Sequence, residues 1–148
     1  LTDAMMKIHQ YTMLCASIIS QEAAIEALDQ PDVDIEEMRS EYMRRRNFIH
    51  NSFQEMGLPC HKPLGAFYAF PYIGHLGLSS KEFALKFLDE ERVAVVPGTA
   101  FGACGEGFVR CAYATSLEDI QEAMLRLRRF IGRLSASTSD ISPPRARA

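Results

Sequence analysis

The chain has 148 residues, and its apolar fraction of 47% and charged fraction of 24% are typical of a globular domain with a substantial core. The net charge of −3 gives no electrostatic basis for binding nucleic acid or an anionic membrane, and no apolar run is long enough to span a bilayer. The cysteines lack zinc-type spacing, which predicts reduced, mostly buried thiols in a cytoplasmic protein. They are Cys15, Cys60, Cys104 and Cys111.

Helices are expected throughout the first third of the chain. Apolar side chains at intervals of three and four predict a helix over residues 1–14. An alanine-rich helix is expected over residues 21–28, with Ser17 or Ser20 as its N-cap. The most regular helical pattern covers residues 34–56. Its expected buried face consists of Ile35, Met38, Tyr42, Ile49, Phe53 and Met56.

Short strands are expected in the remainder of the chain. Residues 58–62 read as an edge strand, because a proline there suits a sheet edge, and residues 66–72 read as an aromatic strand. Residues 93–96 and 108–113 are expected to form two further strands, joined by a glycine-rich loop. The loop glycines lack the spacing of a phosphate-binding motif, so we interpret them as a flexible turn.

Two more helices complete the pattern. Ser79 or Ser80 is expected to cap the first, with Glu82 completing a capping box for Ser79. Thr115 or Ser116 is expected to cap the second. The expected core faces are Phe83, Ala84, Phe87 and Leu88 in the first helix, and Leu117, Ile120, Met124, Leu127, Ile131 and Leu134 in the second.

This order of elements lacks the regular alternation of a doubly wound sheet. It predicts an α+β fold in which helices cover one face of a small, mostly antiparallel sheet. The composition changes to Ser, Thr, Pro, Arg and Ala after residue 134. We therefore expect one domain over residues 1–134 and a disordered tail over residues 135–148.

Arg110 is the residue that stands out chemically. It lies in the apolar strand between Val109 and Cys111, and arginine is rarely buried without a partner because it keeps its charge. Its planar fork suits a carboxylate, which it can bind through two parallel hydrogen bonds. Two hypotheses follow: a structural ion pair with an acid such as Glu106, or an anionic ligand.

No complete catalytic or metal-binding set accompanies this arginine in the sequence. No histidine has a second histidine or a cysteine at metal-ligand spacing, and no nucleophile-elbow motif is present. Lys81 and Lys86 fall in a predicted exposed helix, where little desolvation is available to lower a lysine pKa. Residue chemistry alone therefore identifies one candidate anion-binding residue.

The order of three stretches carries a family resemblance. Residues 65–71, 93–102 and 105–114 resemble, in this order, the C-terminal domain of class I/II, aspartate-aminotransferase-like enzymes of PLP fold type I. Residues 6–11 and 20–24 are similar to the helical segment that follows the cofactor lysine in such enzymes. The combined match is specific, whereas each short motif by itself is not.

The resemblance implies a role for several residues. Arg110 would bind the α-carboxylate of an amino-acid or 2-oxo-acid substrate. Gly65, Ala66, Phe67 and Phe101 match stretches that approach the active site, although the same residues also fit a turn or a core. The intact protein would be a PLP-dependent aminotransferase, with a homodimer as the expected assembly and with no nucleic-acid or membrane partner.

The sequence departs from the family where the cofactor lysine is concerned. Ser80 and Lys81 imitate only the first half of the family's lysine motif and occur at the wrong place in the order. We therefore expect the chain to be the last third of an enzyme, inactive alone, with residues 1–30 as a helical linker to a missing large domain. Two other functions stay open: a PLP-dependent C–S lyase or synthase, and an effector-binding domain of a transcription regulator.

Overall fold

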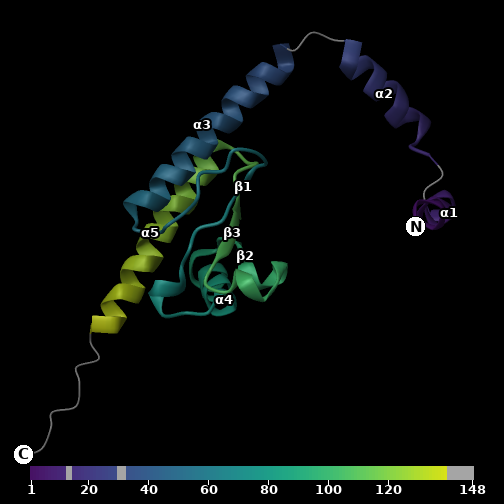
Figure 1. Ribbon diagram of the computed structural model, residues 1–148. Helices are drawn as coiled ribbons and strands as arrows, with labels where there is room; N and C mark the ends of the chain where they lie inside the picture. The colour runs from purple at the N-terminus through teal and green to yellow at the C-terminus, as the bar shows by residue number, and fades with distance from the viewer. Residues whose placement is uncertain (13–14, 30–32, 140–148) are drawn as a thin grey trace, which may run out of the picture. The chain divides into compact units, whose positions relative to one another are not determined.

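The computed structural model describes residues 1–12, 15–29 and 33–139 (Figure 1). The chain divides into two compact units, and the second unit begins at Arg39, inside the third helix. Each unit is described separately below. In the described residues, no helix combines the length and the apolar character that crossing a membrane requires.

The first unit consists of helices whose apolar side chains are exposed. It contains α1 (Thr2–Thr12), α2 (Ile18–Asp29) and the start of α3 (Val33–Glu55). The Ser17 hydroxyl accepts a hydrogen bond from the Ser20 amide at 3.2 Å, so α2 begins earlier than residue 21. Ile35 and Met38, predicted to be buried, are 60% and 61% exposed. Other exposed apolar side chains of this unit are Met5, Met6, Ile8, Tyr11, Ile18, Ile19, Ile25 and Leu28.

The second unit contains the sheet, in which the last strand is central (Figure 1). The strands β1 (Tyr68–Ala69), β2 (Val96–Pro97) and β3 (Val109–Ala112) are antiparallel and lie in the order β1-β3-β2. All three are shorter than the sequence pattern predicted. Two 3₁₀ helices, Gly98–Phe101 and Ala103–Gly105, fill the loop that was predicted to be a simple turn.

The edge strand predicted over residues 58–62 is wrong. The backbone there makes single hydrogen bonds instead of a ladder: the Tyr72 amide donates to the Pro59 carbonyl at 2.8 Å, and the His50 ring contacts the Cys60 carbonyl at 3.2 Å. Pro59 has no amide hydrogen, so this segment cannot sustain strand pairing. Leu58 is nevertheless buried in the core.

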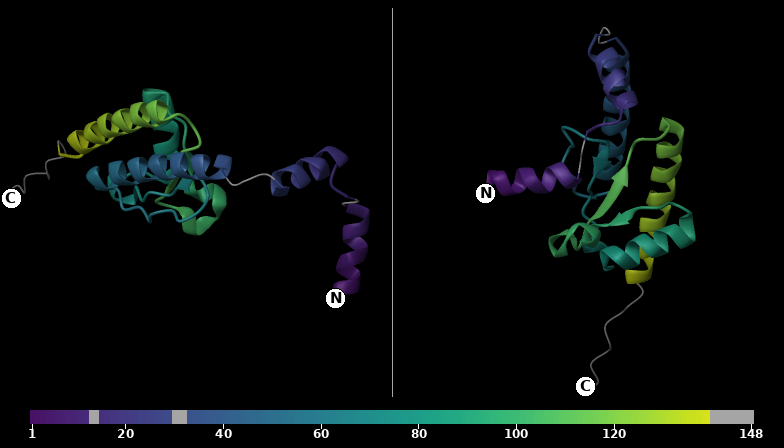
Figure 2. Two further views of the ribbon diagram at one scale, coloured as in Figure 1. Left: turned by 90° about the horizontal axis from the view of Figure 1, so that it is seen from above. Right: turned by 90° about the vertical axis from the view of Figure 1, so that its right-hand side faces the viewer.

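Helices cover one face of the sheet, which confirms the predicted α+β class. Three helices contribute side chains to a single core: the C-terminal half of α3, the whole of α4 (Ser80–Glu91), and α5 (Leu117–Ser139). In Figure 2, α4 crosses α5 on that side of the sheet. The core consists of Ile49, Phe53, Leu58, Ala69, Ile73, Phe83, Phe87, Val109, Cys111, Tyr113, Ile120, Met124, Leu127 and Phe130.

The helix ends agree with the predicted caps, with two corrections. Ser79 and Glu82 form a reciprocal capping box at the start of α4, and Ser116 accepts a hydrogen bond from the Asp119 amide at 3.1 Å. Leu88 is 44% exposed and does not belong to the core. The helix α5 continues to Ser139, so the tail predicted from residue 135 begins too early. Residues 140–148 lie outside the described part of the chain.

Candidate functional site

Arg110 lies on the central strand β3, on the face that the helices leave open. Side chains alternate along a strand, and the neighbours Val109 and Cys111 are buried in the core. The same alternation turns Arg110 and Tyr68 to the opposite face, since Tyr68 pairs with Ala112 in the antiparallel register. Arg110 is half-buried there.

The guanidinium of Arg110 lies between two aromatic rings. Its central carbon is 4.3 Å from the centroid of the Tyr68 ring and 4.8 Å from that of the Phe101 ring. Such contacts are favourable by about 0.5–2 kcal/mol each, depending on exposure to water. We call Arg110, Tyr68 and Phe101 the arginine sandwich. The Arg110 side chain makes no hydrogen bond to a described residue, so its N–H groups remain available for an anion.

No described residue supplies a carboxylate partner to Arg110. The structural hypothesis named Glu106, and that pairing is wrong: the Glu106 carboxylate accepts a hydrogen bond from the Ser80 amide at 2.8 Å, at the start of α4. A carboxylate at a helix N-terminus is already stabilised by the free amides there. The charge of Arg110 is therefore left for a ligand or for another part of a longer chain.

Two further aromatic residues, Phe70 and Phe108, lie beside the Phe101 ring of the sandwich. The centroid of the Phe70 ring lies 6.1 Å from that of the Phe101 ring. The Phe70 ring also stacks on the Phe108 ring, with the two centroids 5.4 Å apart. Phe70 and Phe108 thus extend the aromatic surface beyond Phe101. An ion pair formed beside them is stronger than one formed in open water.

A close crossing of two glycines fixes the loop that carries Phe101. A Cβ atom on Gly98 would lie 2.0 Å from the Gly105 carbonyl oxygen, so only glycine fits there. The Ser80 hydroxyl, which is fully buried, accepts a hydrogen bond from the Gly107 amide at 2.8 Å and ties the loop to α4. Phe101 itself is 52% exposed, yet its backbone is anchored on both sides.

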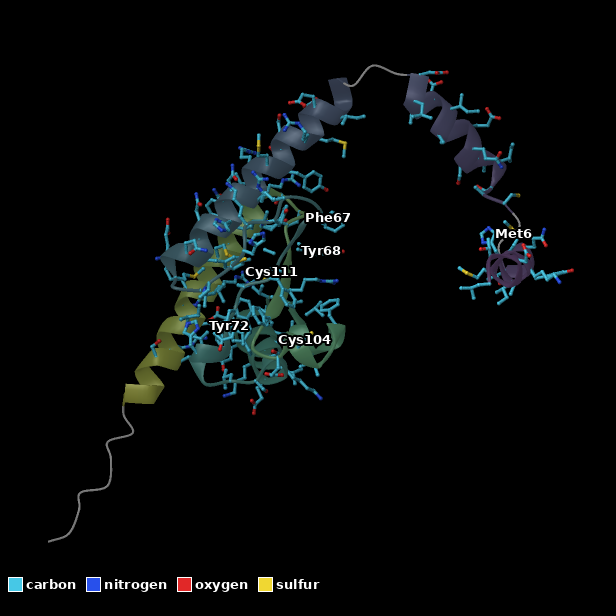
Figure 3. All side chains as sticks on the ribbon, viewed as in Figure 1. Met6, Phe67, Tyr68, Tyr72, Cys104 and Cys111 are labelled. Atoms are coloured by element: carbon cyan, nitrogen blue, oxygen red, sulfur yellow. The ribbon has the colours of Figure 1, made fainter. Side chains whose placement is uncertain are left out.

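The segment 65–67, the other predicted site segment, approaches the sandwich through Phe67. The centroids of the Phe67 and Tyr68 rings are 4.5 Å apart, and Figure 3 shows both residues next to each other, Phe67 just before β1 and Tyr68 at its start. Ala66 has φ = +58°, a left-handed conformation that is uncommon for a residue other than glycine. The structure thus brings Phe101 against Arg110 directly, Phe67 through Tyr68, and Gly65 and Ala66 only as the backbone that precedes them.

Sequence reasoning missed Tyr68, the closer ring of the sandwich. Side chains alternate between the two faces of a sheet along each strand, and this alternation is visible in the sequence. Placing Tyr68 beside Arg110 also needs the register that pairs Tyr68 with Ala112, which the sequence does not reveal.

The described residues offer no candidate catalytic group to accompany Arg110. Lys7, Lys62, Lys81 and Lys86 are all exposed, as predicted for the last two. Burial raises the pKa of the Cys111 thiol to about 12, so this thiol is not a nucleophile near neutral pH. The prediction of mostly buried cysteines is wrong, because Cys15 and Cys104 are exposed and Cys60 is only partly buried. No described group of His, Cys, Asp or Glu has the arrangement of a metal site.

Comparison with known proteins places this geometry in a family. The model of the family "Aminotransferase class I and II" matches residues 1–127. YugH of Bacillus subtilis, which carries the provisional name of an aminotransferase, is 54% identical over 88% of this chain and 34% of its own length. Aromatic-amino-acid aminotransferase 2 of Thermococcus litoralis is 47% identical over 87% of this chain and 34% of its own length.

The fold agrees with that of a solved aminotransferase structure. The aromatic aminotransferase of Pyrococcus horikoshii superposes with a TM-score of 0.82 at 47% identity, over 90% of this chain and 36% of that one. The chain thus spans about a third of the length of the relatives it matches.

Proposed function

The chain belongs to the class I and II aminotransferase family, and on this premise we propose that it is the substrate-carboxylate-binding C-terminal part of a PLP-dependent aminotransferase. The intact protein would transfer an amino group between an amino acid and a 2-oxo acid. The proposal rests on one observation: the guanidinium of Arg110 contacts two aromatic rings, and no described acid neutralises its charge.

Arg110 would act by binding and orienting the substrate. Its two parallel N–H groups match the two oxygens of a carboxylate, which fixes the direction of the carboxylate as well as its position. The contacts with the Tyr68 and Phe101 rings would limit tilting of the guanidinium away from this position. A substrate held in this way presents its Cα–H bond in one orientation, and correct orientation accounts for a large share of enzymatic rate enhancement.

The cofactor would be held by residues outside this chain. Bound PLP supplies an electron sink for the bond that breaks at the substrate Cα atom. No described lysine lies in the arginine sandwich, and Lys81 is exposed in the first turn of α4. The residues present therefore fit the substrate carboxylate and not the anchoring of PLP. The proposal for the cofactor is supported by family membership alone.

The remaining partners are proposed on the same basis. The exposed apolar side chains of α1 and α2 suit packing against a large domain of the same chain and against a second subunit of a homodimer. We also propose a cytoplasmic location. The relatives named above are aminotransferases, which favours this function over a C–S lyase or synthase and over a regulator's effector-binding domain.

Kinetics of the longer enzyme test the proposal. Arg110→Ala should raise the KM for amino-acid donors by about 100-fold or more, because two charge-assisted hydrogen bonds are lost, while the absorbance of bound PLP stays unchanged. The matched control is Arg44→Ala, since Arg44 is exposed and pairs only at the surface with Glu41. Equal KM values for the two variants would refute the role of Arg110.

A second test uses the 148-residue chain itself. Addition of one equivalent of PLP followed by borohydride should give only adducts spread over the exposed lysines and no stoichiometric adduct at any single one, because none of them lies beside Arg110 in a site that would hold the cofactor. A stoichiometric adduct on Lys81 would contradict the assignment of the cofactor lysine to another part of the protein.

A further inference from the structure

Tyr113 connects the segment 65–67 to the strand that carries Arg110. Its hydroxyl donates a hydrogen bond to the Ala66 carbonyl at 2.9 Å. Its backbone amide donates to the Phe67 carbonyl, also at 2.9 Å. One residue, directly after the end of β3, therefore holds two successive peptide groups at the start of β1.

The hydroxyl of Tyr113 is held in place by the packing of its ring in the core. Tyr113 is 1% exposed and belongs to the main core. Burial raises the pKa of its phenol, so the group stays protonated and remains a donor at neutral pH. The core thus determines where the Ala66 carbonyl must lie.

Ala66 needs such a restraint. Its φ of +58° brings its Cβ atom close to the following carbonyl group, which costs about 1–2 kcal/mol for an L-residue other than glycine. The preceding residue leaves room for such a relaxation, since even a Cβ atom on Gly65 would meet nothing within 4 Å. The two hydrogen bonds from Tyr113, one to the Ala66 carbonyl and one to the Phe67 carbonyl, oppose relaxation of Ala66.

The conformation of Ala66 sets the position of the rings that follow it. The centroids of the Phe67 and Tyr68 rings are 4.5 Å apart, and the Tyr68 centroid lies 4.3 Å from the guanidinium carbon of Arg110. A rotation at Ala66 would move the start of β1 and carry both rings with it. The contact path is therefore continuous from the Tyr113 hydroxyl to Arg110.

We propose that Tyr113 is a positioning residue for substrate binding. By holding Ala66 in its left-handed conformation, Tyr113 places the Tyr68 ring against Arg110. The Tyr68 ring in turn orients the guanidinium that binds the substrate carboxylate. This inference rests on the proposed function, because it assigns the oriented guanidinium a substrate. It concerns no proton transfer and no contact between Tyr113 and the substrate.

The first experiment examines the 148-residue chain by NMR. In the wild type, the Arg110 Nε–H resonance should carry a ring-current shift from the two flanking rings. Tyr113→Phe keeps the buried ring and removes only the hydroxyl, so we expect the chain to fold and the Arg110 resonance to lose most of that shift. Tyr72→Phe is the matched control, since the Tyr72 hydroxyl has no hydrogen-bond partner within the described residues.

Two changes at Ala66 separate positioning from a general loss of stability. Ala66→Gly in the Tyr113→Phe background should restore part of the shift, because glycine adopts positive φ without steric cost. Ala66→Val, with the Tyr113 hydroxyl intact, should reduce the shift, because a β-branched residue disfavours this conformation. Ala66 is exposed, so the valine variant leaves the core unchanged.

Kinetics of the longer enzyme complete the test. Tyr113→Phe should raise the KM for amino-acid donors about tenfold, with a smaller change in kcat and unchanged PLP absorbance. If Arg110→Ala raises KM while Tyr113→Phe behaves as Tyr72→Phe in both KM and the Arg110 resonance, the positioning role is wrong and the proposed function stands. If Arg110→Ala leaves KM unchanged, the proposed function fails first.

Discussion

Gly98 and Gly105 cross so closely that a Cβ atom on either residue would lie about 2 Å from the carbonyl oxygen of the other. This crossing closes the base of the loop that presents Phe101 to Arg110. A side chain in this place would meet backbone, which has no rotamer by which to move aside. The position of one ring of the arginine sandwich therefore depends on the absence of two side chains.

Gly98→Ala should destabilise the fold by about 2 kcal/mol or more, since it forces a backbone shift in a packed region. Urea unfolding monitored by circular dichroism measures the change. Gly132→Ala is the control, because a Cβ atom there meets nothing within 4 Å. That change should stabilise α5 by about 0.5–1 kcal/mol, since alanine is the better helix former. Equal stability changes in the two variants would show that the close crossing is absent in solution.

Ser80→Ala should cost about 1–3 kcal/mol, because it leaves the amide of Gly107 buried without its partner. The neighbouring Ser79→Ala removes only an exposed N-cap and should cost about 1 kcal/mol. Hydrogen exchange distinguishes the two: the Gly107 amide should lose protection in Ser80→Ala and keep it in Ser79→Ala. Retained protection in both variants would mean that Ser80 does not anchor the loop.

Glu91 makes the stability of the fold dependent on pH. Its side chain, which is 1% exposed at the end of α4, accepts hydrogen bonds from Arg129 and Arg133 of α5. The Arg129 hydrogen bond, opposed by burial and supported by Arg133, lowers the pKa of Glu91 to about 2. Because the folded state holds the carboxylate ionised, its stabilisation is present above the unfolded pKa of about 4.3 and is lost as pH falls towards 2.

Glu91→Gln should therefore reduce the free energy of unfolding at pH 6 and flatten its decline between pH 5 and pH 2. Urea titrations at several pH values measure this dependence. Glu122→Gln serves as the comparison, since Glu122 pairs with Arg126 at the surface and is 56% exposed. A decline as steep in Glu91→Gln as in the wild type would show that other carboxyl groups determine the acid sensitivity.

Tyr68→Leu should weaken the orientation of Arg110 without removing its charge. A cation–π contact of about 1–2 kcal/mol corresponds to a rise in KM for amino-acid donors of about tenfold in the longer enzyme. Tyr68→Phe keeps the ring and should behave as the wild type. If Tyr68→Phe is as impaired as Tyr68→Leu, the hydroxyl and not the ring face of Tyr68 matters for binding.

The helices and their caps were predictable because their signals are local. Ser79 with Glu82 and Ser116 with Asp119 lie three residues apart, and the structure confirms both caps. The apolar stripe of α5 is confirmed at Ile120, Met124 and Leu127, whereas Leu117 does not reach the core. Phe130, fully buried in α5, was omitted from that stripe although its spacing from Leu127 fits it. The strand over residues 58–62 failed because a buried leucine followed by a proline also fits a coil packed on the core.

Arg110 could be identified from the sequence alone, since a permanent charge within an apolar strand demands an anion. The sequence did not reveal which residues would surround it. Tyr68, Phe101 and Tyr113 lie in three separate segments, and only the strand register and the glycine crossing bring them to the same place. Side-chain chemistry is a property of the residue itself, whereas the orientation of its charge is set by contacts between distant segments, which exist only in the folded chain.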